Sequence, residues 1–338
     1  MNTLTVSHDD LRGADRVSMA PDLRLDAFRI ELGGYCYRML GSPFETEDAV
    51  QETLLRAWRN FDRFDEGRAA LRPWLYKIAT NVCLDMLRSP QRRARAMDMG
   101  PSSSAGSPLG TPLSERSWIL PIPDRLVLAA DLDPAELAAQ RDAVRLAFIA
   151  LLQRLPPRQR AVLILRVVLC WRADEVAQLL DTTVASVTSA LQRARLALAA
   201  ADVAMGEPLQ RMDDTQRDLL ARYCDAFERY DVEALVSLLH EDATMSMPPF
   251  SWWLRGREEI RRALLGAGRP CGGSRLIATV ANGSPAFGQY LPSETAGIHK
   301  AFALVVIELS EGSIRETTSY LEAERLFTLF GLPTELWD

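Results

Sequence analysis

The segment from residue 74 to residue 95 carries aromatic and basic side chains in a combination that suits nucleic acid. Three such residues precede four arginines within eight positions: Trp74, Tyr76, Lys77, Arg88, Arg92, Arg93 and Arg95. Aromatic rings accept unstacked bases, and a basic surface holds the backbone of a displaced strand. The chemistry this favours is binding and opening of a duplex. Two other interpretations stay open: Trp74 as a core tryptophan, and the arginines as a solvated helix end.

A second candidate for DNA binding lies at residues 155–196, which read as a helix-turn-helix. We expect a first helix over 173–180, a break at 181–183 with hydroxyl caps, and a second helix over 183–199. At 100° per residue, one face of the second helix carries Val184, Val187 and Leu191. The opposite face carries Ser186, Ser189 and Arg193, with Arg195 at its flank. A helical hairpin in an all-α core is the alternative, but the absence of acidic residues from this helix favours DNA.

Two amphipathic helices are expected to position the first segment. Residues 46–65 begin with Thr46 as a cap and place an apolar stripe at Val50, Leu54, Trp58 and Phe61. Outside that stripe lie Asp48, Gln51, Glu52 and Leu55. The following helix has its apolar stripe at Leu75, Ile78, Val82 and Met86, and its polar stripe at Lys77, Asn81, Asp85 and Arg88. Pro90 ends it.

The motifs TEDAVQETLLRAW and RPWLYKIATNVCLDMLR, followed by LPPRQRAVLILRVVL and the helix-turn-helix, resemble the extracytoplasmic-function (ECF) type of sigma-70 factors. The resemblance covers roughly residues 21–204 and keeps regions 2 and 4 in the family's order. It implies that the RNA polymerase β′ subunit binds Asp48, Gln51, Glu52 and Leu55. It implies minus-10 contacts from Trp74, Lys77, Asn81, Arg88 and Arg92. It implies minus-35 contacts from Arg172, Ser186, Ser189, Arg193 and Arg195.

Two residues depart from the family's pattern at the helix-turn-helix. Asp181 stands where glycine is usual, and Arg172 stands where a small polar residue is commoner. Both substitutions lie at the ends of the first helix of the motif. We therefore expect an effect on promoter preference or on the geometry of the turn.

Composition separates the two halves of the 338-residue chain. Residues 212–338 carry 19 acidic and 12 basic side chains, whereas the first 211 residues carry 26 and 27. This argues against the C-terminal part as a nucleic-acid binder. The five scattered cysteines indicate neither a disulfide framework nor a metal site, and no apolar run is long enough to span a membrane. A cytoplasmic protein without a cofactor is expected.

Five segments are expected along the chain. Residues 1–20 read as a mobile tail, 21–95 as region 2, 96–133 as a flexible linker, 134–204 as region 4 and 212–338 as a further domain. The linker is rich in Pro, Gly and Ser, yet it contains an apolar patch with Trp118, Pro121 and Pro123. This patch resembles the tryptophan-proline signature of sigma factors with a C-terminal extension, which implies docking between the modules. A tryptophan packed on whichever domain is nearest fits equally well.

The last segment changes character from helices to strands. Two helices are expected over 214–239, followed by strands over 243–247, 276–281, 286–290, 301–309 and 314–321. This pattern indicates an α+β unit with a curved antiparallel sheet. LLHEDATMSMPPFSWWLRGREEIRRAL and SIRETTSYL resemble the cone-shaped nuclear transport factor 2 fold, SnoaL-like branch. The fold class expected for the chain is thus multidomain, with two all-α modules before an α+β domain.

The SnoaL-like fold hosts both enzymes and binding domains, so its site has to be argued from residues. Candidates for a ligand pocket are Tyr223, Met247, Trp253 and His299. Asp242 and His299 do not make a convincing acid–base pair, because Asp242 lies in a helix-end turn and His299 at a strand start. A non-catalytic domain that contacts the sigma part and binds a small apolar ligand is favoured over an enzyme.

The function expected is that of an alternative sigma factor, which directs core RNA polymerase to specific promoters and is regulated by its fused C-terminal domain. Its partners would be the β′ and β subunits of the polymerase and promoter DNA, without a membrane. Two alternatives remain. One is a one-component, ligand-sensing helix-turn-helix regulator, and the other is a cyclase or isomerase fused to DNA-binding helices.

Overall fold

The computed structural model describes residues 21–65, 67, 70–88, 93–129, 133–199, 213–266, 271–321 and 323–337. The expected tail at residues 1–20 and the expected minus-10 residue Arg92 lie outside these ranges. No helix in the described part of the chain is both long enough and apolar enough to cross a bilayer. The described cysteines are all free thiols.

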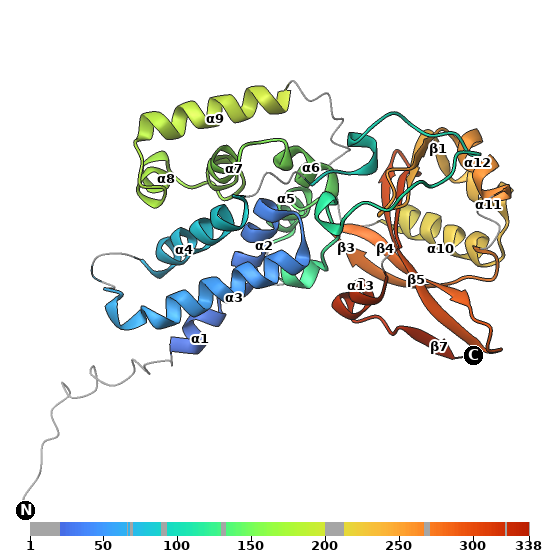
Figure 1. Ribbon diagram of the computed structural model, residues 1–338, viewed down its shortest axis with the longest axis horizontal. Helices are drawn as coiled ribbons and strands as arrows, with labels where there is room; N and C mark the ends of the chain where they lie inside the picture. Colours follow the sequence, from blue (N-terminus) through green and yellow to red (C-terminus); the bar gives the residue numbers. More distant parts are fainter. Residues whose placement is uncertain are drawn as a thin grey trace, which may run out of the picture.

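Four helices form the first module, drawn in blue in Figure 1: α1 (Pro21–Asp26), α2 (Arg29–Leu40), α3 (Pro43–Arg59) and α4 (Leu71–Met86). Helix α3 begins three residues before the expected cap, because the Ser42 side chain accepts from the Glu45 amide and Pro43 fits the first turn. Thr46 is buried inside the helix and donates to the Ser42 carbonyl at 2.7 Å. Helices α2, α3 and α4 share one core around Tyr35 and Leu75.

Five helices form the second module: α5 (Pro134–Asp142), α6 (Leu146–Gln153), α7 (Pro157–Leu163), α8 (Ala173–Leu179) and α9 (Val184–Ala199). The turn between α8 and α9 has the expected caps, since Thr183 Oγ1 accepts from the Ser186 amide at 3.1 Å. Asp181 takes a left-handed backbone, φ 49°, which explains why glycine suits this position in the resembled family.

The C-terminal domain combines helices with a seven-stranded sheet. Its elements are α10 (Asp214–Glu228), α11 (Val232–Ser237), β1 (Leu239–Ser246), β2 (Trp253–Arg255), α12 (Arg257–Leu265), β3 (Arg275–Ala281), β4 (Ser284–Pro292), β5 (Ile298–Ser310), β6 (Ser313–Tyr320), α13 (Ala323–Phe330) and β7 (Glu335–Trp337). The strand order is β2-β1-β6-β5-β4-β3, and β7 pairs with β5. The expected all-antiparallel pairing is wrong at one place, because β1 runs parallel to β6.

Four elements of this domain were not expected from the sequence: β2, α12, α13 and β7. Strands β2 and β7 have three residues each, too few for an alternating pattern to emerge. Helix α13 buries Leu326, Phe327 and Phe330 against β4 and β5. Gly288 of β4 leaves the space for it, since a Cβ there would lie 2.9 Å from Leu332 and 3.2 Å from Phe327.

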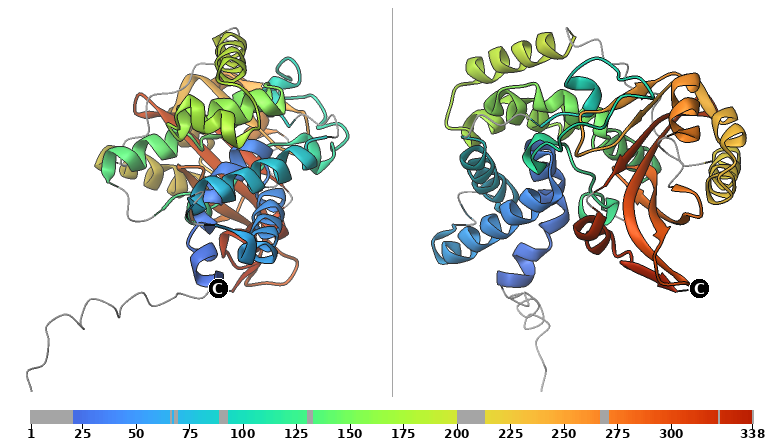
Figure 2. Two further views of the ribbon diagram at one scale, coloured as in Figure 1. Left: turned by 90° about the vertical axis from the view of Figure 1, so that its left-hand side faces the viewer. Right: turned by 45° about the vertical axis from the view of Figure 1, so that its right-hand side comes forward.

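The two faces of the sheet bury different surfaces. Helices α10, α11 and α12 cover one face, where Phe287, Val305 and Ile307 point into a core of their own. The other face turns toward the helical modules (Figure 1 and Figure 2). Tyr290 and Val306 on that face join a single apolar cluster that continues through the linker into both modules. The domain is therefore packed onto the helical part rather than tethered beside it.

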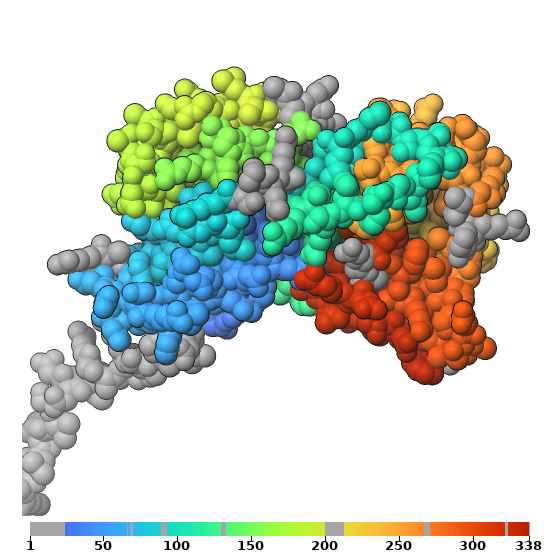
Figure 3. Space-filling model, in the orientation of Figure 1, coloured from blue at the N-terminus to red at the C-terminus, as the bar shows by residue number. Residues whose placement is uncertain are grey.

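The linker does not behave as the flexible connector expected from its composition. Its first half lies across the surface of the C-terminal domain, as the teal segment of Figure 3 shows. The Ser103 amide donates to the Trp253 carbonyl at 2.7 Å, and the Leu113 amide donates to the Pro249 carbonyl at 2.8 Å. Trp253 Nε1 donates to the Gly100 carbonyl at 3.0 Å. Hydrogen bonds to another domain thus supply the order that the segment's own composition lacks.

Candidate nucleic-acid interface

Helix α9 buries two of the three residues predicted for its packing face, whereas Val184, in its first turn, is 47% exposed. Val187 and Leu191 are buried against the rest of the second module, together with Ala194. The four residues of this helix that are predicted to contact DNA are all exposed: Ser186, Ser189, Arg193 and Arg195. Arg172 is also exposed and forms an ion pair with Asp174, 3.1 Å away. The exposed face is therefore free to enter a major groove.

A cavity of about 400 Å³ opens where α3 meets α4. Its lining combines aromatic, apolar and polar side chains: Arg56, Asn60, Arg63, Phe64, Trp74, Ile78 and Asn81. The Trp74 ring is half-buried and stacks on Phe64, with centroids 4.7 Å apart. Trp74 thus packs against its neighbours and also lines a cavity, and its contact with a base stays a prediction. Phe64 was missed because it lies in the connection between the helices, outside any periodic pattern.

Two of the four clustered arginines face inward. Arg93 is buried, pairs with Glu45 at 2.6 Å and donates to the carbonyls of Glu115 and Trp118. Arg95 is also largely buried, beside Asp98. Arg88, just after α4, remains exposed and pairs with Asp85 of α4 at 2.8 Å. Of the three clustered arginines that the structure describes, only Arg88 is therefore exposed enough to contact a phosphate.

The outer face of α3 carries the residues expected to bind the polymerase. Asp48, Gln51 and Leu55 are exposed, and Glu52 is half-exposed and paired with Arg56 at 2.6 Å. Trp58, expected in the core stripe, is instead 55% exposed, because the buried stripe runs through positions 46, 49, 50, 53 and 57. Its ring extends the apolar patch that Leu55 begins, three residues away on the same face.

The two helical modules touch each other through their predicted DNA-binding elements. Lys77 Nζ of α4 lies 2.7 Å from Asp181 Oδ1 in the turn of the helix-turn-helix. The rings of Tyr76 and Trp171 pack with centroids 5.0 Å apart. The Arg72 guanidinium lies 5.5 Å from the centre of the Trp171 ring. Lys77 is therefore engaged by the second module in this structure.

The C-terminal domain holds each helical module by an arginine. Glu308 of β5 and Glu316 of β6 face each other as cross-strand partners on the sheet. Glu308 accepts from Arg145, at the start of α6, at 2.5 Å, and Glu316 lies 3.6 Å from Arg95, which follows the first module. All four side chains are at most 17% exposed. Burial raises the pKa of Glu316, and Arg95 counteracts this.

Family comparisons agree with this division of the chain. Residues 26–93 match Sigma-70 region 2, residues 145–198 match Sigma-70, region 4, and residues 220–315 match the SnoaL-like domain. The ECF RNA polymerase sigma factor SigG of Mycobacterium tuberculosis is 41% identical over 317 residues, which cover 92% of this chain and 83% of SigG. The chain belongs to the ECF RNA polymerase sigma factors.

Two further comparisons concern another sigma factor of M. tuberculosis, SigJ. The two sequences are 29% identical over 249 residues, which cover 71% of each chain. The crystal structure of SigJ covers 92% of this chain with a TM-score of 0.57 and 22% sequence identity. This similarity extends the likeness of fold across both helical modules and the SnoaL-like domain. Membership of the family assigns the chain to transcription initiation rather than to the one-component regulators.

The linker of this sigma factor is docked through its apolar patch. Trp118 is 1% exposed, and Pro121 and Pro123 are buried. The Leu120 amide donates to the Gly41 carbonyl of the first module at 3.0 Å, and Trp118 lines a small cavity together with Pro248 and Tyr320 of the SnoaL-like domain. The patch also bonds to the SnoaL-like domain, because the Ile122 amide donates to Asn282 at 2.9 Å, so the patch as a whole contacts two domains.

The four residues expected to line a ligand pocket do not come together. Tyr223 is buried between α10 and the sheet, where its ring packs against Phe227 and Phe287. Met247 borders that same core. Trp253 faces the linker, and His299, at the start of β5, bonds to the Gly273 carbonyl. Asp242 lies exposed on β1, 3.6 Å from Arg255, and β1 adjoins β6, which pairs with residues 304–310 of β5 and not with its start at His299.

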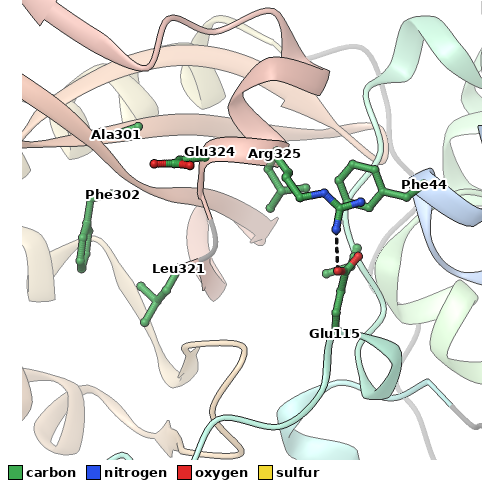
Figure 4. Close-up of a pocket in the computed structure, with 9 residues that line it drawn as sticks. Phe44, Glu115, Ala301, Phe302, Leu321, Glu324 and Arg325 are labelled. Atoms are coloured by element: carbon green, nitrogen blue, oxygen red, sulfur yellow. Dashed lines mark hydrogen bonds and ion pairs between the residues drawn. The ribbon is translucent and has the colours of Figure 1, made fainter.

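A different cavity, of about 440 Å³, opens where the sigma factor's domains meet. Figure 4 shows Phe302 and Leu321 at one side of it and Arg325 at the other. Arg325 of α13 pairs with Glu115 of the linker at 2.7 Å and lies 3.8 Å from the centre of the Phe44 ring. The sequence could not have identified this cavity, because its walls come from α3, the linker and the SnoaL-like domain.

Proposed function

We propose that this structure is the closed, resting form of the sigma factor and that promoter binding requires the two helical modules to separate. The centres of the minus-10 and minus-35 elements lie about 25 base pairs apart, which is roughly 85 Å at about 3.4 Å per base pair. The gap between their near edges is roughly 60 Å. Asp181, which touches Lys77 of α4, lies three residues before α9 begins. A 16-residue helix is about 24 Å long. The two readers therefore cannot span both elements while Lys77 and Asp181 are in contact.

In the open form, we assign the exposed face of α9 to the minus-35 element. Ser186, Ser189 and Arg193 project from it, and Arg195 and Arg172 flank it. Lys77 of α4 and Arg88, which follows α4, are assigned to the minus-10 element. The cavity lined by Trp74 and Asn81 is assigned to an unstacked base of that element, because it pairs an aromatic wall with polar groups.

We propose that the SnoaL-like domain holds the closed form. Glu308 binds Arg145 of the second module, and Glu316 binds Arg95 beside the first. One rigid sheet therefore fixes the positions of both modules. The acidic balance of the domain supports this role, since its carboxylates occupy arginines that would otherwise suit a phosphate backbone.

The small ligand expected from the sequence is assigned to the cavity between α13 and the linker. Its volume lies in the usual range of ligand sites, about 300 to 1,000 Å³, and domain interfaces are common places for such sites. Phe302, Leu321 and Leu326 give it an apolar wall. A hydrophobic fluorescent probe should bind there, and Leu326→Arg should abolish that binding. Acid–base catalysis by this domain is not proposed, because Asp242 and His299 have separate partners.

A reversible lock tests the closed-form proposal in the full chain. Lys77→Cys and Asp181→Cys, in a Cys170→Ser background that removes the exposed native thiol, are bridged by a short cleavable bis-maleimide. Bridged protein should give no run-off transcript with core polymerase, and cleavage of the bridge should restore it. Lys77→Cys alone, labelled in the same way, serves as the control and should not respond to cleavage. Equal output from bridged and cleaved protein contradicts the proposal.

A further inference from the structure

One residue of the SnoaL-like domain reaches the linker and both helical modules together. Asn282, at the tip of the β3–β4 hairpin, is 0% exposed. Its side-chain Nδ2 donates to the Tyr37 hydroxyl of α2 and to the Val144 carbonyl just before α6, each at 2.7 Å. Its Oδ1 accepts from the Ile122 amide of the linker at 2.9 Å. Three segments of different modules thus meet on one side chain.

The hydrogen bonds of this tip use the full donor capacity of the amide. Both Nδ2 protons and one Oδ1 lone pair are engaged, and the Asn282 amide also donates to the Ile122 carbonyl at 3.1 Å. The next residue adds a further contact, since the Gly283 amide donates to Asp124 at 2.8 Å. On the far side, the Tyr37 hydroxyl donates to the Leu120 carbonyl at 2.8 Å. The tip therefore completes a buried polar chain from the first module through the linker to the second.

The backbone explains why the hairpin can present an asparagine at this place. Asn282 has φ 56° and is followed by Gly283 with φ 75°, which is the left-handed pair that a two-residue hairpin favours. Glycine would satisfy the same turn without any side chain. The turn alone therefore does not require the amide group. What requires it is the surrounding set of one amide, one hydroxyl and one carbonyl that are buried with it.

We propose that Asn282 is a positioning residue that sets the distance between the two helical modules. This inference rests on the closed-form function proposed above and states that the modules separate when the β3–β4 tip withdraws. Withdrawal of the tip removes the donor to the Tyr37 hydroxyl, the donor to the Val144 carbonyl and the acceptor of the Ile122 amide. Groups left unsatisfied in a closed interface are costly, whereas water satisfies them once the modules part. The closed form is thus stable only while the tip is inserted.

Asn282→Gly in the full chain tests this assignment, because it keeps the left-handed turn and removes only the side-chain contacts. The matched control is Glu311→Gly in the β5–β6 turn, which has the same left-handed backbone, φ 50°, but is exposed. We expect hydrogen exchange at the Ile122 amide to accelerate about 5- to 100-fold in Asn282→Gly and not in the control. We also expect more run-off transcript with core polymerase, by roughly threefold or more.

A purely structural role for Asn282 predicts a different result. In that case Asn282→Gly would lower both thermal stability and transcript yield, and the proposal would be overturned. Tyr37→Phe approaches the same contact from the first module, so its effect on exchange should not add to that of Asn282→Gly. Additive effects also contradict the proposal. If the cysteine lock controls output while Asn282→Gly changes nothing, this inference fails and the closed-form function stands.

Discussion

The ion pair between Arg145 and Glu308 is expected to be the strongest single electrostatic contact between the SnoaL-like domain and the second module. The two side chains are 10% and 14% exposed, and Ser284 also donates to Glu308 at 2.7 Å. Removing one partner of a buried pair costs about 3 to 5 kcal/mol, because the other charge is left without compensation. Asp142 stays 3.9 Å from Arg145, so the lower figure applies. Glu308→Ala should then favour the undocked form by roughly 100-fold, at about 1.4 kcal/mol per tenfold change.

The pair between Lys77 and Asp181 provides the contrast. Its side chains are 40% and 74% exposed. Exposed pairs contribute about 0.2 to 1 kcal/mol, which corresponds to a shift of only about 1.4- to 5-fold. Opening of the modules should therefore respond far more strongly to Glu308→Ala than to Asp181→Asn. The position of the SnoaL-like domain, rather than the direct contact between the DNA readers, then controls the closed form.

Hydrogen exchange read by mass spectrometry measures this difference directly. The amides of Ile122 and Asn282 bond across the domain interface and should exchange about 100-fold faster in Glu308→Ala. Glu294→Ala makes the same charge change at an exposed position of the same domain and should leave them unchanged. Exchange in Glu308→Ala within threefold of the parent chain would refute the assignment of the interface to this pair.

Three further outcomes are expected. Leu55→Arg should abolish co-purification with core polymerase and leave the thermal midpoint within about 2 °C, because the side chain is 40% exposed on the outer face of α3. Arg193→Ala should weaken minus-35 duplex binding and reduce the salt dependence, d log K/d log [salt], by about 0.9, as expected for one lost phosphate contact. Lowering the pH towards the raised pKa of Glu316 should strengthen docking. Burial raises the pKa of Glu316, so the docked form binds the proton more tightly than the undocked form. The stabilisation of docking by this proton is lost as the pH rises through that pKa. Glu316→Gln should therefore flatten the pH dependence of the urea midpoint.

Helix α9 and the arginine cluster show what the sequence could and could not predict. The burial of Val187 and Leu191 opposite Ser186 follows from helical period alone, so it could be predicted locally. The inward turn of Arg93 could not, because its partner Glu45 lies in another helix and no local pattern joins the two. From sequence alone, a cluster of like charges predicts exposure to solvent or binding to phosphate. Only the fold shows that a carboxylate from a distant part of the chain pairs with it.

The prediction of a flexible linker was wrong for a related reason. Its Pro, Gly and Ser content correctly indicates that it lacks a core of its own, but order came from backbone hydrogen bonds to Trp253 and Pro249. The same limit applies to the ligand site. Tyr223 lies packed in the core of one domain, whereas the cavity of about 440 Å³ is formed by three segments that the sequence does not bring together.

The polar character of the central contacts suits an interface that has to open. Asn282, Glu308 and Glu316 each meet a charged or hydrogen-bonding partner from another module. Such pairs add little net stability relative to hydrated groups, yet they are costly when displaced by a few ångströms. An interface built on them has one well-defined closed position and a modest total free energy of docking. Burial of apolar residues such as Trp118 then determines the free energy of docking, and the polar contacts of the β3–β4 tip determine the docked position.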